Sequence, residues 1–202
     1  MNKNYFRLIQ NCKKIAVGIL LAVGSVGTVS AQLSGSYTIN SAAASSSTNY
    51  TSLAAFVTAL NTSGVSGAVT ASVKTSETVT NNVVFRNISG VSSTNTITID
   101  GGGFRYSSSV ANEMGLTTSA SNAEVIRFSG TDYVTIKNYI IENSNTSTNG
   151  RIIRFEADAN GNSADYNNIL SCTLQFSART SGSTSAGAYV VFGNSLTASV
   201  TS

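Results

Sequence analysis

Histidine, tryptophan and proline are all absent from the 202 residues of the sequence. Without histidine the chain has no imidazole zinc ligand, no Ser-His-Asp triad and no histidine acid–base catalyst. Charged residues are also scarce, at 10% of the chain. Such a composition, rich in Ser, Thr, Asn and Gly, is typical of disordered chains or of β-proteins with polar loops. The recurrent Val, Ile and Phe runs favour a folded β-protein.

The first 31 residues have the organisation of a secretory signal peptide. The basic residues of this leader are Lys3, Arg7, Lys13 and Lys14. Residues 15–27 are apolar and residues 29–31 read Val-Ser-Ala, which predicts cleavage before Gln32. A membrane anchor is disfavoured, because the apolar run is short of the ~20 residues that a spanning helix needs. We therefore expect a secreted protein, extracellular or at the bacterial cell surface, with no membrane insertion after signal removal.

Removing the leader changes the charge and the cysteine count. Four of the 12 basic residues leave with it, so eight remain against nine acidic residues, a net charge of −1. This balance predicts no nucleic-acid partner, which would require clustered basic residues. Cys12 also leaves, so Cys172 remains alone and no intramolecular disulfide is expected. The apolar surroundings of Cys172 in the sequence predict an inert buried thiol.

Residues 32–66 are interpreted as a lead-in with one strand-like piece (36–39) and one short helix at about 52–61. Within this segment the apolar residues at helical spacing are Leu53, Phe56, Val57 and Leu60. Thr51 or Ser52 can cap the helix and Gly64 can end it. We expect the helix to cover the open end of a β-stack. A partner-binding or membrane-surface helix is the alternative, but it would need a basic face.

One sequence pattern occurs twice, in residues 125–144 (VIRFSGTDYVTIKNYIIENS) and 152–177 (IIRFEADANGNSADYNNILSCTLQFS). Equivalent residues lie 33 positions apart in the pairs Tyr133 and Tyr166, Ile136 and Ile169, Ile141 and Leu174, Ser144 and Ser177. Residues 190–193 (VVFG) open a third copy. Repetition at this period is typical of stacked-repeat proteins.

These repeats predict an all-β fold, a right-handed parallel β-helix (solenoid) with one short N-terminal capping α-helix. A β-sandwich is the alternative, but residues recur here at coil length and Asn-Gly hairpin signals are lacking. We expect residues 67–202 to form the coils and the stack to continue beyond Ser202, unless another element covers that end. The residues expected in inward rows are Ile126, Phe128, Ile136, Ile153, Phe155, Ile169 and Leu174.

Three segments of the chain carry a family resemblance. In chain order they are the helix segment NYTSLAAFVTALNTSGVSGAVTASV, then VSSTNTITIDGGG, and then VIRFSGTDYVTIKNYIIENS. Over residues 35–177 the chain resembles the N-terminal part of large secreted bacterial surface proteins. These have a pectin-lyase-like parallel β-helix, are often exported by the type IX pathway and are usually described as adhesin-like. The resemblance implies a surface role. Members typically continue to a C-terminal sorting domain, and this chain differs from them because it stops inside a repeat.

The segment from Glu156 to Asp165 is the best candidate for a metal site. Asp158, Asn160, Asn162 and Asp165 offer oxygen ligands at calcium-loop spacing. Ser163 stands where an EF-hand requires Gly, so a non-EF calcium turn is the hypothesis and a solvated polar loop the alternative. No other cofactor is predicted. Gly101-Gly102-Gly103 lacks the residues of a phosphate loop and is interpreted as a tight corner.

No cluster of catalytic residues is visible, and the carboxylates are scattered along the chain. Arg127 and Arg154 are equivalent in the two copies and predict an outward row, either a solvated face or a glycan-binding or lyase surface. Thr94 to Thr98 offers a Thr-x-Thr segment for ice or glycan binding, with a weaker second one in residues 131–135. The leading hypothesis is a non-enzymatic β-helix module for adhesion or cell-surface architecture, with glycans or surface proteins as partners. The alternative is a carbohydrate-binding or polysaccharide-degrading protein whose catalytic part lies beyond this chain.

Overall fold

A computed structural model describes residues 31–110, 124–145, 151–177, 188–192 and 199–201. Apart from Ala31, these residues belong to one unit, Gln32–Ser202. The unit is mostly β, and α2 (Leu53–Ser63) is the one helix among the described residues. Every pairing between the described strands is parallel. The prediction of a mostly β chain with parallel strands and a helix is therefore confirmed. No described helix has the length and apolarity to cross a membrane.

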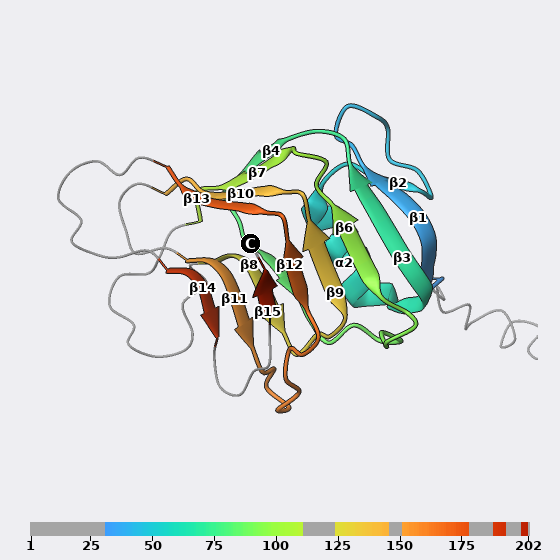
Figure 1. The fold of residues 1–202 in the computed structure, drawn as a ribbon. Coiled ribbons are helices and arrows are strands. Elements are labelled where there is room, and N and C mark those ends of the chain that lie inside the picture. The colour runs from blue at the N-terminus through green and yellow to red at the C-terminus, as the bar shows by residue number, and fades with distance from the viewer. Residues whose placement is uncertain (1–30, 111–123, 146–150, 178–187, 193–198, 202) are drawn as a thin grey trace, which may run out of the picture. The chain divides into compact units, whose positions relative to one another are not determined.

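The strands form three sheets, called A, B and C here (Figure 1). Sheet A runs in the order β2 (Asn49–Tyr50), β1 (Leu33–Ile39), β3 (Val65–Val73), β6 (Ile97–Asp100), β9 (Val134–Lys137), β12 (Asn168–Leu170) and β15 (Ser199–Thr201). Sheet B runs β4 (Glu77–Val79), β7 (Arg105–Ser108), β10 (Ile140–Asn143) and β13 (Thr173–Phe176). Sheet C runs β5 (Val83–Phe85), β8 (Glu124–Ser129), β11 (Arg151–Glu156) and β14 (Ala188–Phe192). From β3 onward the chain visits A, B and C in turn.

The register of the sheets matches the repeat seen in the sequence. Ile136 pairs with Ile169, and Ile141 pairs with Leu174. The third copy is also confirmed, because Val190-Val191-Phe192 of β14 pairs with residues 153–155 of β11. An earlier copy was missed: Val83-Val84-Phe85 of β5 pairs with residues 126–128 of β8. The predicted equivalences are therefore lateral neighbours in parallel sheets.

Inward residues of all three sheets and of α2 join in one hydrophobic core. Six of the seven residues predicted inward are at most 3% exposed: Ile126, Phe128, Ile136, Ile153, Phe155 and Ile169. The seventh, Leu174, is half-buried and packs against the same core. Phe85, Phe128 and Phe155 stack in a column, with ring centroids 5.0 Å and 4.6 Å apart. We call these three residues the phenylalanine column.

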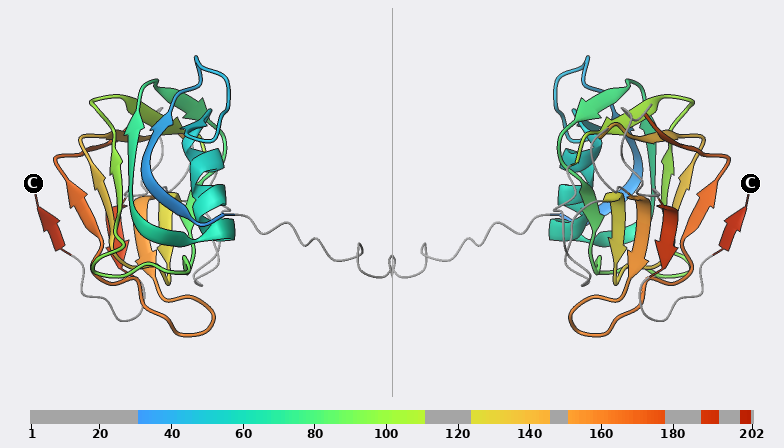
Figure 2. Two further views of the ribbon diagram at one scale, coloured as in Figure 1. Left: turned by 90° about the vertical axis from the view of Figure 1, so that its right-hand side faces the viewer. Right: turned by 90° about the vertical axis from the view of Figure 1, so that its left-hand side faces the viewer.

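Helix α2 lies beside the first strand of sheet C and covers its free edge (Figure 2). Its four predicted inward residues are at most 2% exposed. Ser52 accepts a hydrogen bond from the Ala55 amide at 3.1 Å, and Gly64 ends the helix with a φ of 70°. The Asn61 side chain donates to the Val84 carbonyl (2.8 Å) and accepts from the Arg86 amide (3.0 Å). These bonds satisfy backbone groups of β5 as a neighbouring strand would, which is the covering role predicted.

Candidate functional site

The outer face of sheet A carries two rows of side chains that cross five strands. We call the first the polar row: Ser36, Thr70, Thr98, Thr135 and Asn168. The second consists of Thr38, Ser72, Asp100, Lys137 and Leu170. All ten side chains are exposed or partly exposed. Of the two predicted Thr-x-Thr segments, Thr98 and Thr135 lie in the polar row, whereas Thr131 is buried. The row is wider than predicted because Ser and Asn occupy equivalent places.

Asp100 and Lys137 form an ion pair in the second row, with a Nζ–Oδ2 distance of 3.3 Å. The Asp100 carboxylate also accepts from Asn138 Nδ2 (3.1 Å) and the Gly102 amide (3.0 Å). Partial burial raises the pKa of Asp100, but these hydrogen bonds and Lys137 outweigh it and hold the pKa below its ordinary value. Gly102 and Gly103 have positive φ, as the predicted tight corner requires.

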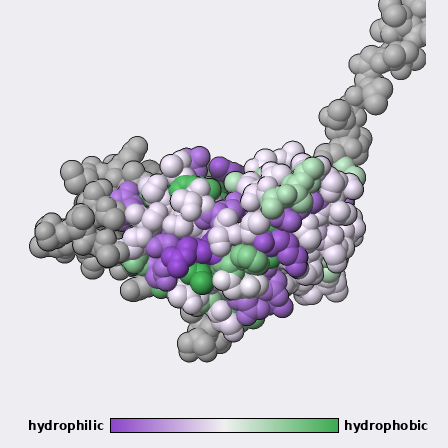
Figure 3. Space-filling view, turned by 90° about the horizontal axis from the view of Figure 1, so that it is seen from above, coloured by the Kyte–Doolittle hydropathy of each residue, from purple (hydrophilic) through white to green (hydrophobic). Residues whose placement is uncertain are grey.

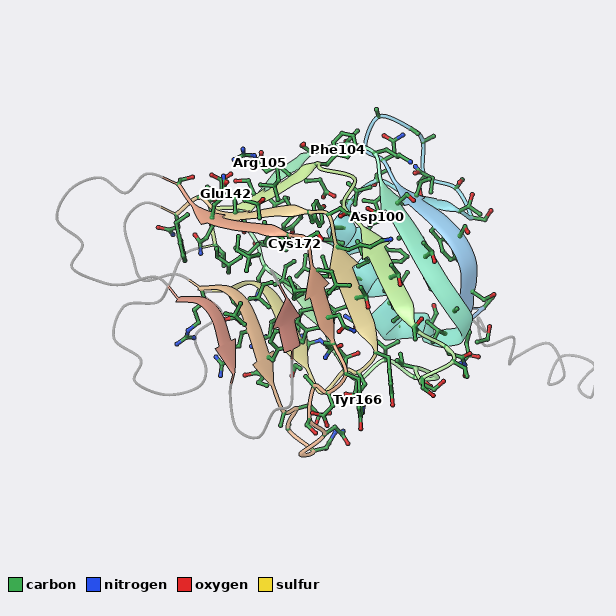
Figure 4. All side chains as sticks on the ribbon, viewed as in Figure 1. Asp100, Phe104, Arg105, Glu142, Tyr166 and Cys172 are labelled. Carbon is green, nitrogen blue, oxygen red and sulfur yellow. The ribbon has the colours of Figure 1, made fainter. Side chains whose placement is uncertain are left out.

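Two stacked tyrosines, Tyr133 and Tyr166, lie at the edge of this face where β9 and β12 begin. We call them the tyrosine pair. Their ring centroids are 4.9 Å apart with an interplanar angle of 6°. Tyr166 is 65% exposed, and Figure 4 shows it at the end of sheet A away from Asp100. Asn168 of the polar row donates to the Tyr166 carbonyl at 3.4 Å and to Thr135 Oγ1 at 3.5 Å. Asn168 therefore links the polar row to the corner that carries Tyr166.

An aspartate precedes each ring of the tyrosine pair. The Asp165 amide donates to Asp132 Oδ1 at 2.6 Å, which joins the two corners. Burial, and to a smaller extent the charge of Asp165, raise the pKa of Asp132 above its ordinary value. The hydrogen bond from the Asp165 amide lowers the pKa but does not outweigh them. Asp165 Oδ2 in turn accepts from Ser163 Oγ at 2.8 Å. This end of sheet A is thus locally acidic.

The loop predicted to bind calcium brings three of its four named residues together. Asp158 Oδ1 accepts from the amides of Asn160 (2.9 Å) and Asn162 (3.0 Å), and Oδ2 accepts from Asn162 Nδ2 (2.8 Å). These bonds hold the pKa of Asp158 below its ordinary value, the Asn162 side chain most strongly. Asp165 bonds instead to Ser163 and Asp132. The described residues contain no group of three or more His, Cys, Asp or Glu placed for a metal. The calcium turn stays a prediction.

Four charged side chains gather on sheet C. Arg127 and Arg154 are lateral neighbours, as predicted. Arg154 Nη2 lies 2.8 Å from Glu156 Oε2, and Arg127 contacts Glu156 at 3.5 Å and Glu124 at 3.4 Å. The prediction of a solvated face is wrong for Arg154, whose side chain is only 8% exposed. A buried guanidinium needs anionic partners, and the two glutamates supply them.

Glu124 is the most deeply buried member of this cluster, at 0% exposure. Both of its carboxylate oxygens lack a hydrogen-bond partner within the part of the chain that the structure describes. Burial raises its pKa, against the charges of Arg127 and Arg154, which lower it. A carboxyl with a raised pKa beside arginines has the chemistry of a proton donor. Because Glu124 is completely buried, a polymer substrate would have to displace neighbouring groups to reach it.

The outer face of sheet B mixes hydrophilic and hydrophobic side chains (Figure 3). Arg105 Nη1 lies 2.6 Å from Glu142 Oε2, and Ser177 Oγ donates to Glu142 Oε1 at 2.7 Å. Arg105 and Glu142 lie together above the sheet in Figure 4. Cys172, which was predicted to be buried, is half-buried between β12 and β13, and burial raises the pKa of its thiol. A raised thiol pKa lowers the thiolate fraction, which supports the predicted inert cysteine.

Comparison with known proteins adds no assignment to these surfaces. A scan against protein-family models gave no match, and searches of curated proteins and of solved structures gave none either. The candidate sites therefore depend on their own geometry. Sequence reasoning found Asp158 to Asp165 and the arginine pair, but it missed Glu124 and the tyrosine pair as a surface. Tyr133 and Tyr166 were recognised only as equivalent positions.

Proposed function

We propose that this chain is a secreted, non-enzymatic module for adhesion or cell-surface architecture, built as a right-handed parallel β-helix. Strands three apart in the sequence pair in register, which supports successive coils with sheets A, B and C as three faces. About 98% of crossover connections between parallel strands of one sheet are right-handed, which supports the right-handed coil. Residues 1–31 act as the export signal, and glycans or surface proteins are the partners.

The observation that carries the proposal is the structural use of the carboxylates. All eight acidic residues in the described ranges accept a hydrogen bond or pair with a base: Glu77, Asp100, Glu124, Asp132, Glu142, Glu156, Asp158 and Asp165. Glu124 is also completely buried. Glycoside hydrolysis generally needs two carboxyl groups on either side of a bond in reach of the sugar. Groups committed to the scaffold fit a binding or architectural protein better.

The alternative, a carbohydrate-active protein, has one specific observation in its favour. Glu124, Arg127 and Arg154 place a carboxyl of raised pKa beside two cations. Lyase-type chemistry can use such a combination once a substrate reaches it. In this alternative the rest of the catalytic apparatus lies beyond Ser202.

Export and adhesion are tested together by expressing the full chain in a bacterium with the matching secretion route. We expect an exported protein that begins at Gln32 and increases attachment of displaying cells to glycan-coated surfaces. Cells that display an unrelated β-protein are the control. Retention of residues 1–31, or attachment equal to the control, would contradict the proposal.

Catalysis is tested by incubating the purified protein with neutral and uronate polysaccharides and measuring reducing ends and unsaturated products. We expect no turnover. Products that disappear in Glu124→Gln, with the melting temperature unchanged, would replace the proposal with the enzymatic alternative.

A further inference from the structure

The tyrosine pair occupies backbone positions that do not suit tyrosine. Tyr133 and Tyr166 both have a φ of 55°. In this left-handed region the Cβ of an L-residue approaches the following carbonyl, so glycine and asparagine are the usual occupants. Strained conformations of this kind persist where the surrounding structure enforces them, and they concentrate at binding sites. The sequence places the same large ring at both positions.

The opposite ends of the same two strands provide an internal comparison. Asn138 follows β9 with a φ of 53°, and Ser171 follows β12 with a φ of 50°. These corners have nearly the same φ as the tyrosines but carry small polar side chains, one of which is asparagine. The fold therefore accepts a small residue at a left-handed corner, and a tyrosine at the other end is not demanded by the turn.

Burial does not explain the rings either. Tyr166 is the one large hydrophobic side chain that is exposed in the described part of the chain. The flat stacking of Tyr133 on Tyr166 presents aromatic surface at the edge of sheet A. Exposed aromatic surface beside hydrogen-bonding groups is the usual make-up of a ligand site.

The groups beside the tyrosine pair match the chemistry of a sugar chain. Thr98, Thr135 and Asn168 follow one another across β6, β9 and β12, at the inter-strand spacing of about 4.8 Å. Their hydroxyl and amide groups both donate and accept, as the hydroxyls of a sugar do. The aliphatic C–H face of a pyranose ring is apolar and can lie against an aromatic ring.

Charge selects among sugar chains. Asp132 and Asp165 directly precede the two tyrosines, and Asp158 packs against Gly130 at the same corner. Lys137, at the far end of β9, is already paired with Asp100. A uronate polymer would bring its carboxylates toward these aspartates and be repelled.

We propose that the tyrosine pair and the polar row from Thr98 to Asn168 form a binding site for a neutral polysaccharide. The sugar rings pack against the tyrosines, and sugar hydroxyls bond along the row. This inference rests on the proposed adhesive function and names its ligand class.

The test is affinity gel electrophoresis of the purified protein in gels that contain a neutral β-glucan, xylan or galactomannan, with polygalacturonate as the charged counterpart. We expect retardation by at least one neutral polymer and none by polygalacturonate. The double variant Tyr133→Asn/Tyr166→Asn removes the rings and keeps a residue suited to the backbone. It should weaken retardation by about tenfold or more, with the melting temperature unchanged or higher.

Ser171→Asn is the matched control, because it makes a similar replacement at the opposite corner and should leave retardation unchanged. Equal retardation of the double variant, or retardation by polygalacturonate alone, would overturn the inference. So would a double variant with a lower melting temperature and unchanged retardation, since the rings would then serve stability. Absence of retardation by every polymer also overturns the inference, whereas the proposed function fails separately if displaying cells do not attach to any surface.

Discussion

Two aromatic stacks run along the repeats with nearly the same geometry. In the phenylalanine column the rings lie 5.0 Å and 4.6 Å apart, with interplanar angles of 7° and 13°. In the tyrosine pair the rings lie 4.9 Å apart at 6°. Both arise because equivalent residues of successive repeats are lateral neighbours. The phenylalanines are at most 1% exposed, whereas Tyr166 is 65% exposed.

The difference shows that stacking geometry alone does not reveal what a stack contributes. Burying a phenylalanine removes its whole side chain from water, which stabilises the fold by roughly 1.5–3 kcal/mol. The exposed Tyr166 gains little from burial, Tyr133 is only partly buried, and both have a strained backbone. The phenylalanine column is therefore assigned to stability and the tyrosine pair to binding, and each assignment can be tested.

The largest effect is expected for Phe128→Ala, at the centre of the phenylalanine column. It leaves a cavity between Phe85 and Phe155, and we expect it to lower the free energy of unfolding by about 3–5 kcal/mol. Urea unfolding followed by circular dichroism measures this change. Tyr166→Ala removes a similar ring outside the core and should cost less than about 1 kcal/mol. Equal losses for the two variants would refute the comparison.

Arg154→Met tests whether an outward side chain can contribute as much to the stability of the fold as an inward one. The substitution leaves Glu156 without its 2.8 Å partner and removes a cation near the buried Glu124. We expect the free energy of unfolding to fall by about 2–3 kcal/mol, because buried charges are left uncompensated. Arg86→Met, at an exposed position, is the control and should change stability by no more than about 0.5 kcal/mol. If Arg154→Met matches the control, the sheet C cluster is solvated after all.

Glu77 places a carboxyl on the inward face of sheet B. Its Oε1 accepts from the Leu53 amide at 2.8 Å, yet burial keeps its pKa above the ordinary value of 4.5. The folded protein therefore holds this proton more tightly than the unfolded chain. The contribution of Glu77 to stability is fully present below the unfolded pKa and is lost as the pH rises through the folded pKa. Glu77→Gln keeps an acceptor for Leu53, so its stability relative to the wild type should increase as the pH rises through this window.

Glu142→Gln provides a control of opposite sign on the outer face of the same sheet. Burial raises the pKa of Glu142, but hydrogen bonds from Ser177 and Arg105 outweigh it and hold the pKa below the ordinary value. The wild-type advantage over this variant is therefore present above the unfolded pKa and is lost as the pH falls through the folded pKa. Urea unfolding at several pH values measures both differences, and parallel slopes for the two variants would contradict the assignment.

The smallest effect is expected in the loop around Asp158. Asp158→Ala removes the acceptor of the Asn160 and Asn162 amides, so their hydrogen exchange should become faster. Asp158→Asn keeps one oxygen acceptor and should stay closer to the wild type. If the loop binds calcium, added calcium will slow exchange in the wild type and raise its melting temperature. Unchanged exchange and melting in excess calcium would remove the calcium prediction.

The predictable part of the fold was the part with short-range signals. The amphipathic spacing of residues 53–60 located α2. Its observed bounds, Leu53–Ser63, differ from the predicted 52–61 by one residue at the N-terminal end and two at the C-terminal end. The repeated Tyr, Ile and Phe positions of two copies gave the correct lateral neighbours. Val83-Val84-Phe85 was missed as a copy because it lies 43 residues before residues 126–128, whereas the recognised copies lie 27 and 37 residues apart. Insertions in the turns hide an equivalence that the core enforces.

The burial and the contacts of side chains were harder to predict from the sequence than the pairing of equivalent residues in neighbouring strands. The equivalence of Arg127 and Arg154 was visible, but the burial of Arg154 depends on what packs around sheet C. The buried Asn167 is another example: it donates to the Thr131 carbonyl (2.8 Å) and accepts from the Val134 amide (3.0 Å). In sequence it was one of many asparagines in polar turns. Only its distance from the backbone of the preceding repeat distinguishes it.

The sequence by itself determined the alternation of apolar residues, the amphipathic helix and the equivalence of Tyr133 with Tyr166. These features follow from local backbone geometry and from repetition, and the spacing of residues in the sequence shows both. The inward positions of Phe128 and Phe155 were also predicted from the sequence. The tertiary structure alone decided that Tyr166 is exposed. It also joined Ser36, Thr70, Thr98, Thr135 and Asn168 into one row. The physical reason is that the turns differ in length, so residues at irregular spacing become neighbours only when the core brings the strands into register.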